Sequence, residues 1–210
     1  MTREQWLNEL AAAMRPIFAG APGGPWPVPD KLRISVGWPS ERALSKKKRV
    51  IGQCWHPKCS ADAHHEIFVS PVLGDAHQAA ETVLHEMIHA VVGTECGHKG
   101  AFVACAKAVG FLKPWTSTPA SDELKARLQG VLANLPAFPH ATLDAEEIEK
   151  LRKKQTTRLV KVECGACGYT ARTTRKWLEE RGAPICPCNK EPMVAPDFPE
   201  GEDPEAEDSD

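Results

Sequence analysis

The first part of the chain shows apolar positions with the period of a helix, followed by short apolar runs. Residues 3–18 are expected to form an amphipathic helix. Its apolar positions at helical spacing are Trp6, Leu10, Ala13 and Ile17. Glycine and proline are frequent in residues 19–30, which predicts a loop. Three apolar runs then predict strands over residues 32–38, 50–55 and 65–70. One helix followed by three short strands predicts an α+β fold with a small antiparallel or mixed sheet.

The middle of the chain is predicted to be helical. Asp75 is a suitable N-cap and Gly93 a suitable stop, so a helix is expected over residues 76–92. Similar signals predict three further helices over residues 99–109, 121–134 and 144–154. The last of these is charged, and its glutamate–lysine pairs at i,i+4 favour a helix.

The helix predicted over 76–92 carries an HExxH motif. The motif consists of His85, Glu86, Met87, Ile88 and His89. Residues i and i+4 lie one turn apart on one face of a helix, so the two imidazoles can reach one zinc ion. Glu86 lies about 100° further round the helix, within reach of a water molecule on that metal. The pattern indicates a zinc hydrolase with Glu86 as general base, and the alternative is a pair of surface histidines that bind nothing.

A catalytic zinc site needs a third protein ligand and an open fourth position. The metzincin spacing would place a glycine and a histidine at positions 92 and 95, and the chain has neither there. Three downstream candidates remain, namely Glu95, Cys96 and His98. We favour His98 because Gly93 and Gly97 let the chain reverse. His98 is expected to open the next helix, so that its side chain can face the first.

The charge of the chain is unevenly distributed. Its net charge is −2, but eight acids and no base occur in residues 197–210. Segment 150–190, in contrast, contains eleven Lys and Arg against three Glu, which points toward nucleic acid; the alternative is a solvated face. The N-terminus lacks the regions of a signal peptide, and no stretch is apolar for long enough to cross a membrane. We therefore expect a soluble, cytoplasmic protein with no membrane partner.

Paired cysteines in a cytoplasmic protein are typical of metal binding. Cys164 and Cys167 form one pair, and Cys186 and Cys188 form a second pair, with eighteen residues between the two pairs. Four thiolates at this spacing predict a zinc ribbon with a closed, structural zinc site. The alternative is free or disulfide-bonded cysteines. The remaining cysteines have no tight ligand spacing, and we interpret Cys54 as a packing residue.

The stretch between the two cysteine pairs contains cations next to an aromatic side chain. The residues concerned are Arg172, Arg175, Lys176 and Trp177. Such a combination suits phosphate contact and base stacking, so these residues are candidates for binding DNA, including single-stranded DNA. The alternative is that Trp177 forms the small core of the ribbon.

The motifs GQCW, IFVS, HEMIHAVVG and GHKGAF, with the closing cysteine ribbon, resemble the SprT-like metallopeptidases, relatives of Spartan. The resemblance covers residues 30–190. It implies a zincin-like domain followed by a zinc ribbon, with one catalytic and one structural zinc ion. By match, His85, His89 and His98 are zinc ligands and Glu86 is the catalytic acid/base. It also implies proteolysis of DNA-bound or DNA-crosslinked proteins, which is a role in DNA repair.

Together these signals divide the chain into four expected parts. They are a zincin metallopeptidase domain over 1–143, a helical linker over 144–157, a zinc ribbon over 158–192 and a disordered acidic tail over 193–210. Two other functions stay open: a general cytosolic metallopeptidase with a purely structural ribbon, and a non-enzymatic zinc protein that binds DNA or regulates on a zincin scaffold.

Overall fold

The computed structural model describes residues 1–152 and 159–195, and the chain divides into two compact units. We call Met1–Leu151 the N-terminal unit and Arg152–Asp210 the C-terminal unit. The end of the predicted linker and almost all of the predicted acidic tail lie outside the described residues. Within the described part, no helix is long and apolar enough to cross a membrane.

The N-terminal unit contains a three-stranded sheet. Its strands are β1 (Leu32–Val36), β2 (Gly52–Trp55) and β3 (His65–Val69). Strand β3 lies in the centre, parallel to β1 and antiparallel to β2. The sheet is therefore mixed, which is one of the two arrangements expected from the strand pattern, and β2 is an edge strand.

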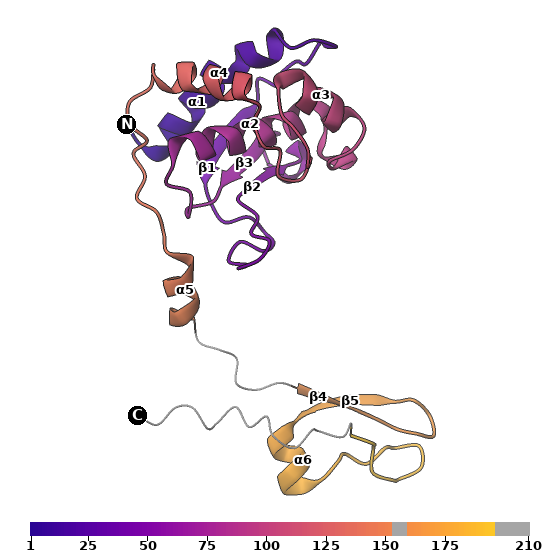
Figure 1. Cartoon of the computed structure of the whole chain (residues 1–210). Coiled ribbons are helices and arrows are strands. Elements are labelled where there is room, and N and C mark those ends of the chain that lie inside the picture. The colour runs from indigo at the N-terminus through magenta and orange to yellow at the C-terminus, as the bar shows by residue number, and fades with distance from the viewer. Residues whose placement is uncertain (153–158, 196–210) are drawn as a thin grey trace. The chain divides into compact units, whose positions relative to one another are not determined.

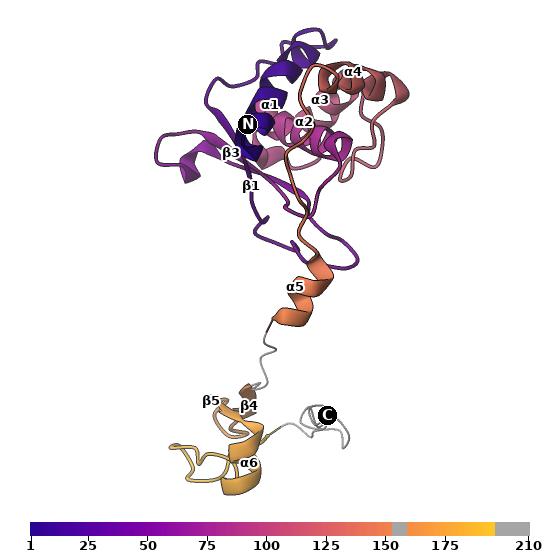
Figure 2. The ribbon, with the colours of Figure 1, turned by 90° about the vertical axis from the view of Figure 1, so that its left-hand side faces the viewer.

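Helices cover one face of this sheet (Figures 1 and 2). Helices α1 (Arg3–Ala19) and α2 (Ala76–Val92) contact the strands, and α3 (Ala101–Val109) and α4 (Asp122–Leu132) pack on α2. The short α5 (Ala145–Leu151) is not part of this layer (Figure 1). Two 3-10 turns, η1 (Pro57–Cys59) and η2 (Thr94–Cys96), follow β2 and α2. Helix α2 contacts β2, β3, α1, α3 and α4. It is the central element of the unit, so packing on several sides determines which way its side chains point.

Local sequence signals account for the ends of the main helices. A capping box joins Thr2 and Gln5 at the start of α1. Three of the four expected apolar positions of α1 are buried, whereas Ala13 is exposed. The buried face is wider than expected and also includes Leu7, Ala11, Met14 and Phe18. Met14 follows Leu10 by four residues, which keeps it on the same face of the helix.

The C-terminal unit is a small ribbon. Its described elements are β4 (Leu159–Glu163), β5 (Thr170–Thr174) and α6 (Arg175–Arg181), with β4 and β5 forming an antiparallel hairpin. Its core consists of Val162, Cys164, Cys186 and Met193. This core is small, and two of its four buried residues are cysteines. Such a core is typical of a fold that depends on a metal ion.

Candidate metal centres

Helix α2 places the two histidines of the HExxH motif on one side. The helix begins where the Asp75 carboxylate accepts a hydrogen bond of 2.8 Å from the backbone N–H of Gln78. It ends at Gly93, whose φ of 89° is a left-handed conformation that favours glycine. The chain turns back immediately, through η2 and Gly97 with a φ of 51°. This reversal brings His98 to the histidines of α2. His98 lies in the turn before α3 rather than in its first turn, which is a correction to the sequence-based expectation.

The Nε2 atoms of three histidines converge. His98 Nε2 lies 3.0 Å from His85 Nε2 and 3.3 Å from His89 Nε2. Two nitrogen ligands of a tetrahedral zinc ion are about 3.3 Å apart, given Zn–N bonds of about 2.0–2.1 Å. The cluster therefore fits three of the four positions of a zinc site, and its composition is compatible with zinc.

The two other candidates for third ligand have different contacts. Glu95 pairs with His56, its Oε1 atom 3.1 Å from His56 Nε2. The Cys96 thiol donates to the Gly93 carbonyl at 3.3 Å. The cluster formed with His85 and His89 contains His98 and neither of these side chains. The closeness of His98 to His85 and His89 in space thus favours it as the third ligand, and spacing along the sequence alone could not show this.

The three imidazoles are held in their neutral form. Burial lowers the pKa of His85 to about 3, with a further contribution from the neighbouring His89 and His98. Burial also lowers the pKa of His89 to about 4 and that of His98 in the same direction. A neutral imidazole is the form that binds a metal ion.

Phe102 on α3 packs against all three histidine rings. Its ring centroid lies 5.0 Å from that of His85, 4.5 Å from that of His89 and 4.8 Å from that of His98. Its side chain is completely buried. Sequence reasoning did not single out this residue. The only signal was its place in the GHKGAF motif, four residues after His98.

Glu86 is buried beside the edge strand. Its side chain lies against Gly52 of β2, and a Cβ atom built on Gly52 would come within 2.5 Å of Glu86 Oε1. Burial raises the pKa of Glu86 to about 8, and a hydrogen bond from the backbone of Cys54 opposes this shift. A divalent cation next to the carboxylate would favour its charged form. The Cys54 thiol has its pKa raised to about 12 by burial, which agrees with its interpretation as a packing residue.

The four ribbon cysteines also form one cluster. The Sγ–Sγ distances are 3.7 Å for Cys164–Cys188, 3.6 Å for Cys167–Cys186 and 3.4 Å for Cys186–Cys188. A disulfide would need about 2.05 Å, so these cysteines are not bonded to one another. Zn–S bonds of about 2.3 Å in a tetrahedron imply Sγ–Sγ distances of about 3.8 Å. The cluster is compatible with a zinc ion held by four thiolates.

The two cysteine pairs lie on equivalent backbone turns. In the first turn, the Gly168 N–H donates to the Cys164 carbonyl, and the Cys164 N–H donates to the Tyr169 carbonyl. In the second turn, the Lys190 N–H donates to the Cys186 carbonyl, and the Cys186 N–H donates to the Glu191 carbonyl. The fifth residue of each turn has a positive φ, 72° at Gly168 and 61° at Lys190. Cys167 is the fourth residue of its turn and Cys188 the third. The shorter CxC spacing therefore still brings its thiol to the cluster.

The predicted DNA-contact residues lie on the surface of the ribbon. Trp177 is 51% exposed, and Leu178 packs against the ribbon core in its place. The structure thus rules out the alternative that Trp177 forms that core. Arg175 pairs with Glu179 and Lys176 with Glu180 along α6. Arg172 is exposed on β5, opposite Lys161 on β4, so two cations face each other across the hairpin.

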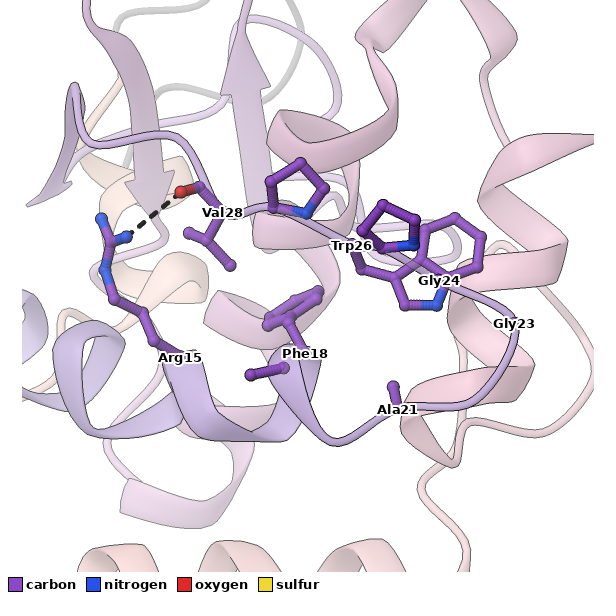
Figure 3. Close-up of a pocket in the computed structure, with 10 residues that line it drawn as sticks. Arg15, Phe18, Ala21, Gly23, Gly24, Trp26 and Val28 are labelled. Carbon is purple, nitrogen blue, oxygen red and sulfur yellow. Dashed lines mark hydrogen bonds between the residues drawn. The ribbon is translucent and has the colours of Figure 1, made fainter.

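A pocket of about 680 Å³ lies elsewhere in the N-terminal unit (Figure 3). It is formed by the end of α1 and the loop after it, including Phe18 and Trp26, and Arg15 donates to the Val28 carbonyl at its edge. It shares no residue with the histidine cluster. Arg15 is its only charged lining residue, so we assign it no catalytic role.

Comparisons with known proteins found no matching family model, curated protein or solved structure.

Proposed function

We propose that the histidine cluster holds a catalytic zinc ion and that the chain is a zinc-dependent endopeptidase. One observation carries the proposal: three neutral imidazoles converge through Nε2 next to the buried carboxylate of Glu86. A bound zinc ion would supply Lewis acidity, which lowers the pKa of a water molecule and polarises a carbonyl group. Three protein ligands leave a fourth position for these groups, as catalytic zinc sites require.

The residues of the chain account for the remaining requirements of peptide hydrolysis. A carboxylate oxygen of Glu86 accepts the proton of the attacking water and then delivers it to the leaving amine nitrogen. Gly52 leaves the space in which this carboxylate lies. Burying a carboxyl group costs free energy, and a protein that only binds zinc does not need one at this position. The buried Glu86 therefore favours an enzyme over a zinc protein that only binds or regulates.

Replacing Glu86 with glutamine tests the catalytic part of the proposal. The amide keeps the size of the side chain and removes the base, so we expect cleavage of a casein substrate to fall by about 10²–10⁴-fold. Zinc content should be unchanged, because Glu86 is not a ligand. His98→Ala should lose the zinc of this site together with activity. Activity like that of the unchanged protein in Glu86→Gln would contradict the assignment, and no cleavage by the unchanged protein would favour the non-enzymatic alternative.

We further propose that the substrates are DNA-bound or DNA-crosslinked proteins and that the ribbon contacts the DNA. Support comes from the exposed Trp177, which offers a face for base stacking, and from the facing cations Arg172 and Lys161. Lys161 also pairs with Glu163 on its own strand, so Arg172 is the cation of this pair that we assign to a phosphate contact. Because the ribbon and the histidine cluster belong to one chain, DNA would raise the effective concentration of substrate at the enzyme.

A stimulation assay tests the DNA part. Single-stranded DNA should accelerate cleavage of a DNA-binding protein and leave cleavage of a neutral peptide unchanged. Arg172→Ala with Trp177→Ala should remove the acceleration and reduce the slope of log affinity against log salt by about 0.7 for one lost phosphate contact. Lys125→Ala, which removes a cation from α4, is the charge control and should retain both. Cleavage that DNA does not accelerate would favour a general metallopeptidase with a structural ribbon.

A further inference from the structure

The segment between α3 and α4 sends one buried side chain to the histidine cluster. Thr118 is 3% exposed, and its Oγ1 atom lies 2.7 Å from Nδ1 of His85. The two residues are 33 positions apart in the chain. The contact is on the side of the ring away from Nε2, which faces the other two histidines.

The backbone at Thr118 is strained. Its φ is +38°, in the left-handed region that a β-branched residue rarely adopts. Two hydrogen bonds hold this conformation: the N–H of Thr118 donates to the Pro114 carbonyl at 2.8 Å, and that of Leu112 donates to the Pro119 carbonyl at 2.8 Å. A strained residue that its surroundings hold in place points to a role for its side chain.

The direction of the hydrogen bond follows from the chemistry of the cluster. A histidine that binds a metal through Nε2 carries its proton on Nδ1, so Nδ1 of His85 must donate and the Thr118 hydroxyl must accept. The neighbouring ligand differs, since Nδ1 of His89 is buried and has no hydrogen-bond partner among the described residues. Of the two histidines of α2, His85 thus has its Nδ1 atom bonded to this segment and His89 does not.

We propose that Thr118 is a positioning residue whose hydroxyl accepts from Nδ1–H of His85 and so orients the ring with Nε2 toward the metal ion. The proposal rests on the metal site proposed above. A hydroxyl can donate as well as accept, so in the zinc-free protein the same contact serves either tautomer of His85. With a metal ion on Nε2 only the Nδ1–H form remains, and without the hydroxyl this buried N–H would lose its acceptor.

The test compares Thr118→Val with Thr118→Ser in the full chain. Valine keeps the shape and the β-branch but removes the hydroxyl, whereas serine keeps the hydroxyl. Spectra of the zinc-loaded proteins should show a His85 Nδ1–H that exchanges slowly with solvent in the unchanged protein and in Thr118→Ser, and faster in Thr118→Val. Zinc affinity of the histidine cluster should fall by about 10–100-fold in Thr118→Val and be largely restored in Thr118→Ser.

Two controls separate positioning from a general loss of structure. The Nδ1–H signal of His89 should be the same in all variants. Thr82→Val removes another buried threonine hydroxyl, bonded to the Gln78 carbonyl on α2, and should leave the Nδ1–H exchange of His85 and the zinc affinity unchanged. An unchanged zinc affinity and Nδ1–H exchange in Thr118→Val, or a serine variant as defective as the valine variant, would overturn the proposal. A failure of the metal site is distinct from this outcome, because it would appear as no zinc binding by the unchanged protein.

Discussion

At the scale of single residues, the place of the Glu86 side chain depends on the absence of a side chain at Gly52. A Cβ atom on Gly52 would lie 2.5 Å from Glu86 Oε1, 2.6 Å from Thr82 Cγ2 and 3.0 Å from Glu86 Cγ. Such distances are too short for ordinary contact, and the buried Glu86 side chain has little room to move. Strand β2 and helix α2 can therefore approach one another this closely only because residue 52 is glycine.

We expect Gly52→Ala to displace the Glu86 carboxylate. Cleavage should fall at least about 10-fold, because a catalytic group that moves by a fraction of an ångström loses its productive geometry. Zinc content should be retained, and the free energy of unfolding should fall by about 1–3 kcal/mol. Gly130→Ala on α4 is the matched control, since nothing lies within 4 Å of its new Cβ atom, and it should be neutral or slightly stabilising. Full activity in Gly52→Ala, measured with the same substrate, would refute this role.

At the scale of elements, the histidine cluster lies where α2, the turn after it and α3 pack together. Helix α2 provides two of the rings, the turn provides the third, and Phe102 of α3 lies in contact with all three. The rings are therefore held by packing on one side, and a metal ion would approach from another. Ring orientation in this arrangement depends on the distance between α2 and α3.

Phe102→Ala should weaken both the fold and the metal site. Removing a fully buried phenylalanine costs about 3–5 kcal/mol of unfolding free energy. The histidine rings would also lose their packing surface, so zinc affinity should fall. Phe111→Ala is the control, because Phe111 is almost as deeply buried but is not in contact with the histidine rings in the described contacts. Denaturant unfolding measures the stability of both variants, and competitive zinc titration measures their zinc affinity. Equal zinc affinities would show that the histidine rings do not need Phe102.

At the scale of the whole molecule, each unit carries one candidate metal site but the two units differ in their need for it. The N-terminal unit has a large buried core drawn from α1, α2, α3, α4 and the sheet. The C-terminal unit has a core of four buried residues, two of which are cysteines of the cluster. A segment this small cannot bury enough apolar surface to fold without a further source of stability such as a bound metal ion.

Metal removal should therefore affect the two units differently. The unchanged protein is expected to contain two zinc ions per chain. A chelator should unfold residues 159–195 and leave the N-terminal unit folded, which 1H–15N spectra of the full chain would show as loss of dispersed signals from the ribbon alone. Cys164→Ser should have the same effect and lose one zinc ion, and His98→Ala should lose one zinc ion without unfolding either unit. If both units unfolded together on chelation, the histidine site would be structural rather than catalytic.

The sequence alone determined the parts of this protein that depend on neighbouring residues. The cap at Asp75 and the stop at Gly93 predicted α2 with the bounds that the structure has, and helical periodicity placed His85 and His89 on one face. The cysteine pairs likewise indicated a shared site, because each pair is one turn of backbone. These features follow from local hydrogen bonding and side-chain spacing, which a short window of sequence contains.

Only the tertiary structure decided which distant residues complete the sites. The sequence favoured His98 as third ligand, but only the fold brought its ring to those of His85 and His89. No local signal placed Thr118 at His85 or set Gly52 beside Glu86. The exposure of Trp177 was equally open, because its helix could have turned either Trp177 or Leu178 toward the ribbon core. Each of these outcomes depends on how chain reversals, strand register and helix packing bring separate segments together. Such contacts are settled by the burial of the whole core, and no single segment of the sequence encodes them.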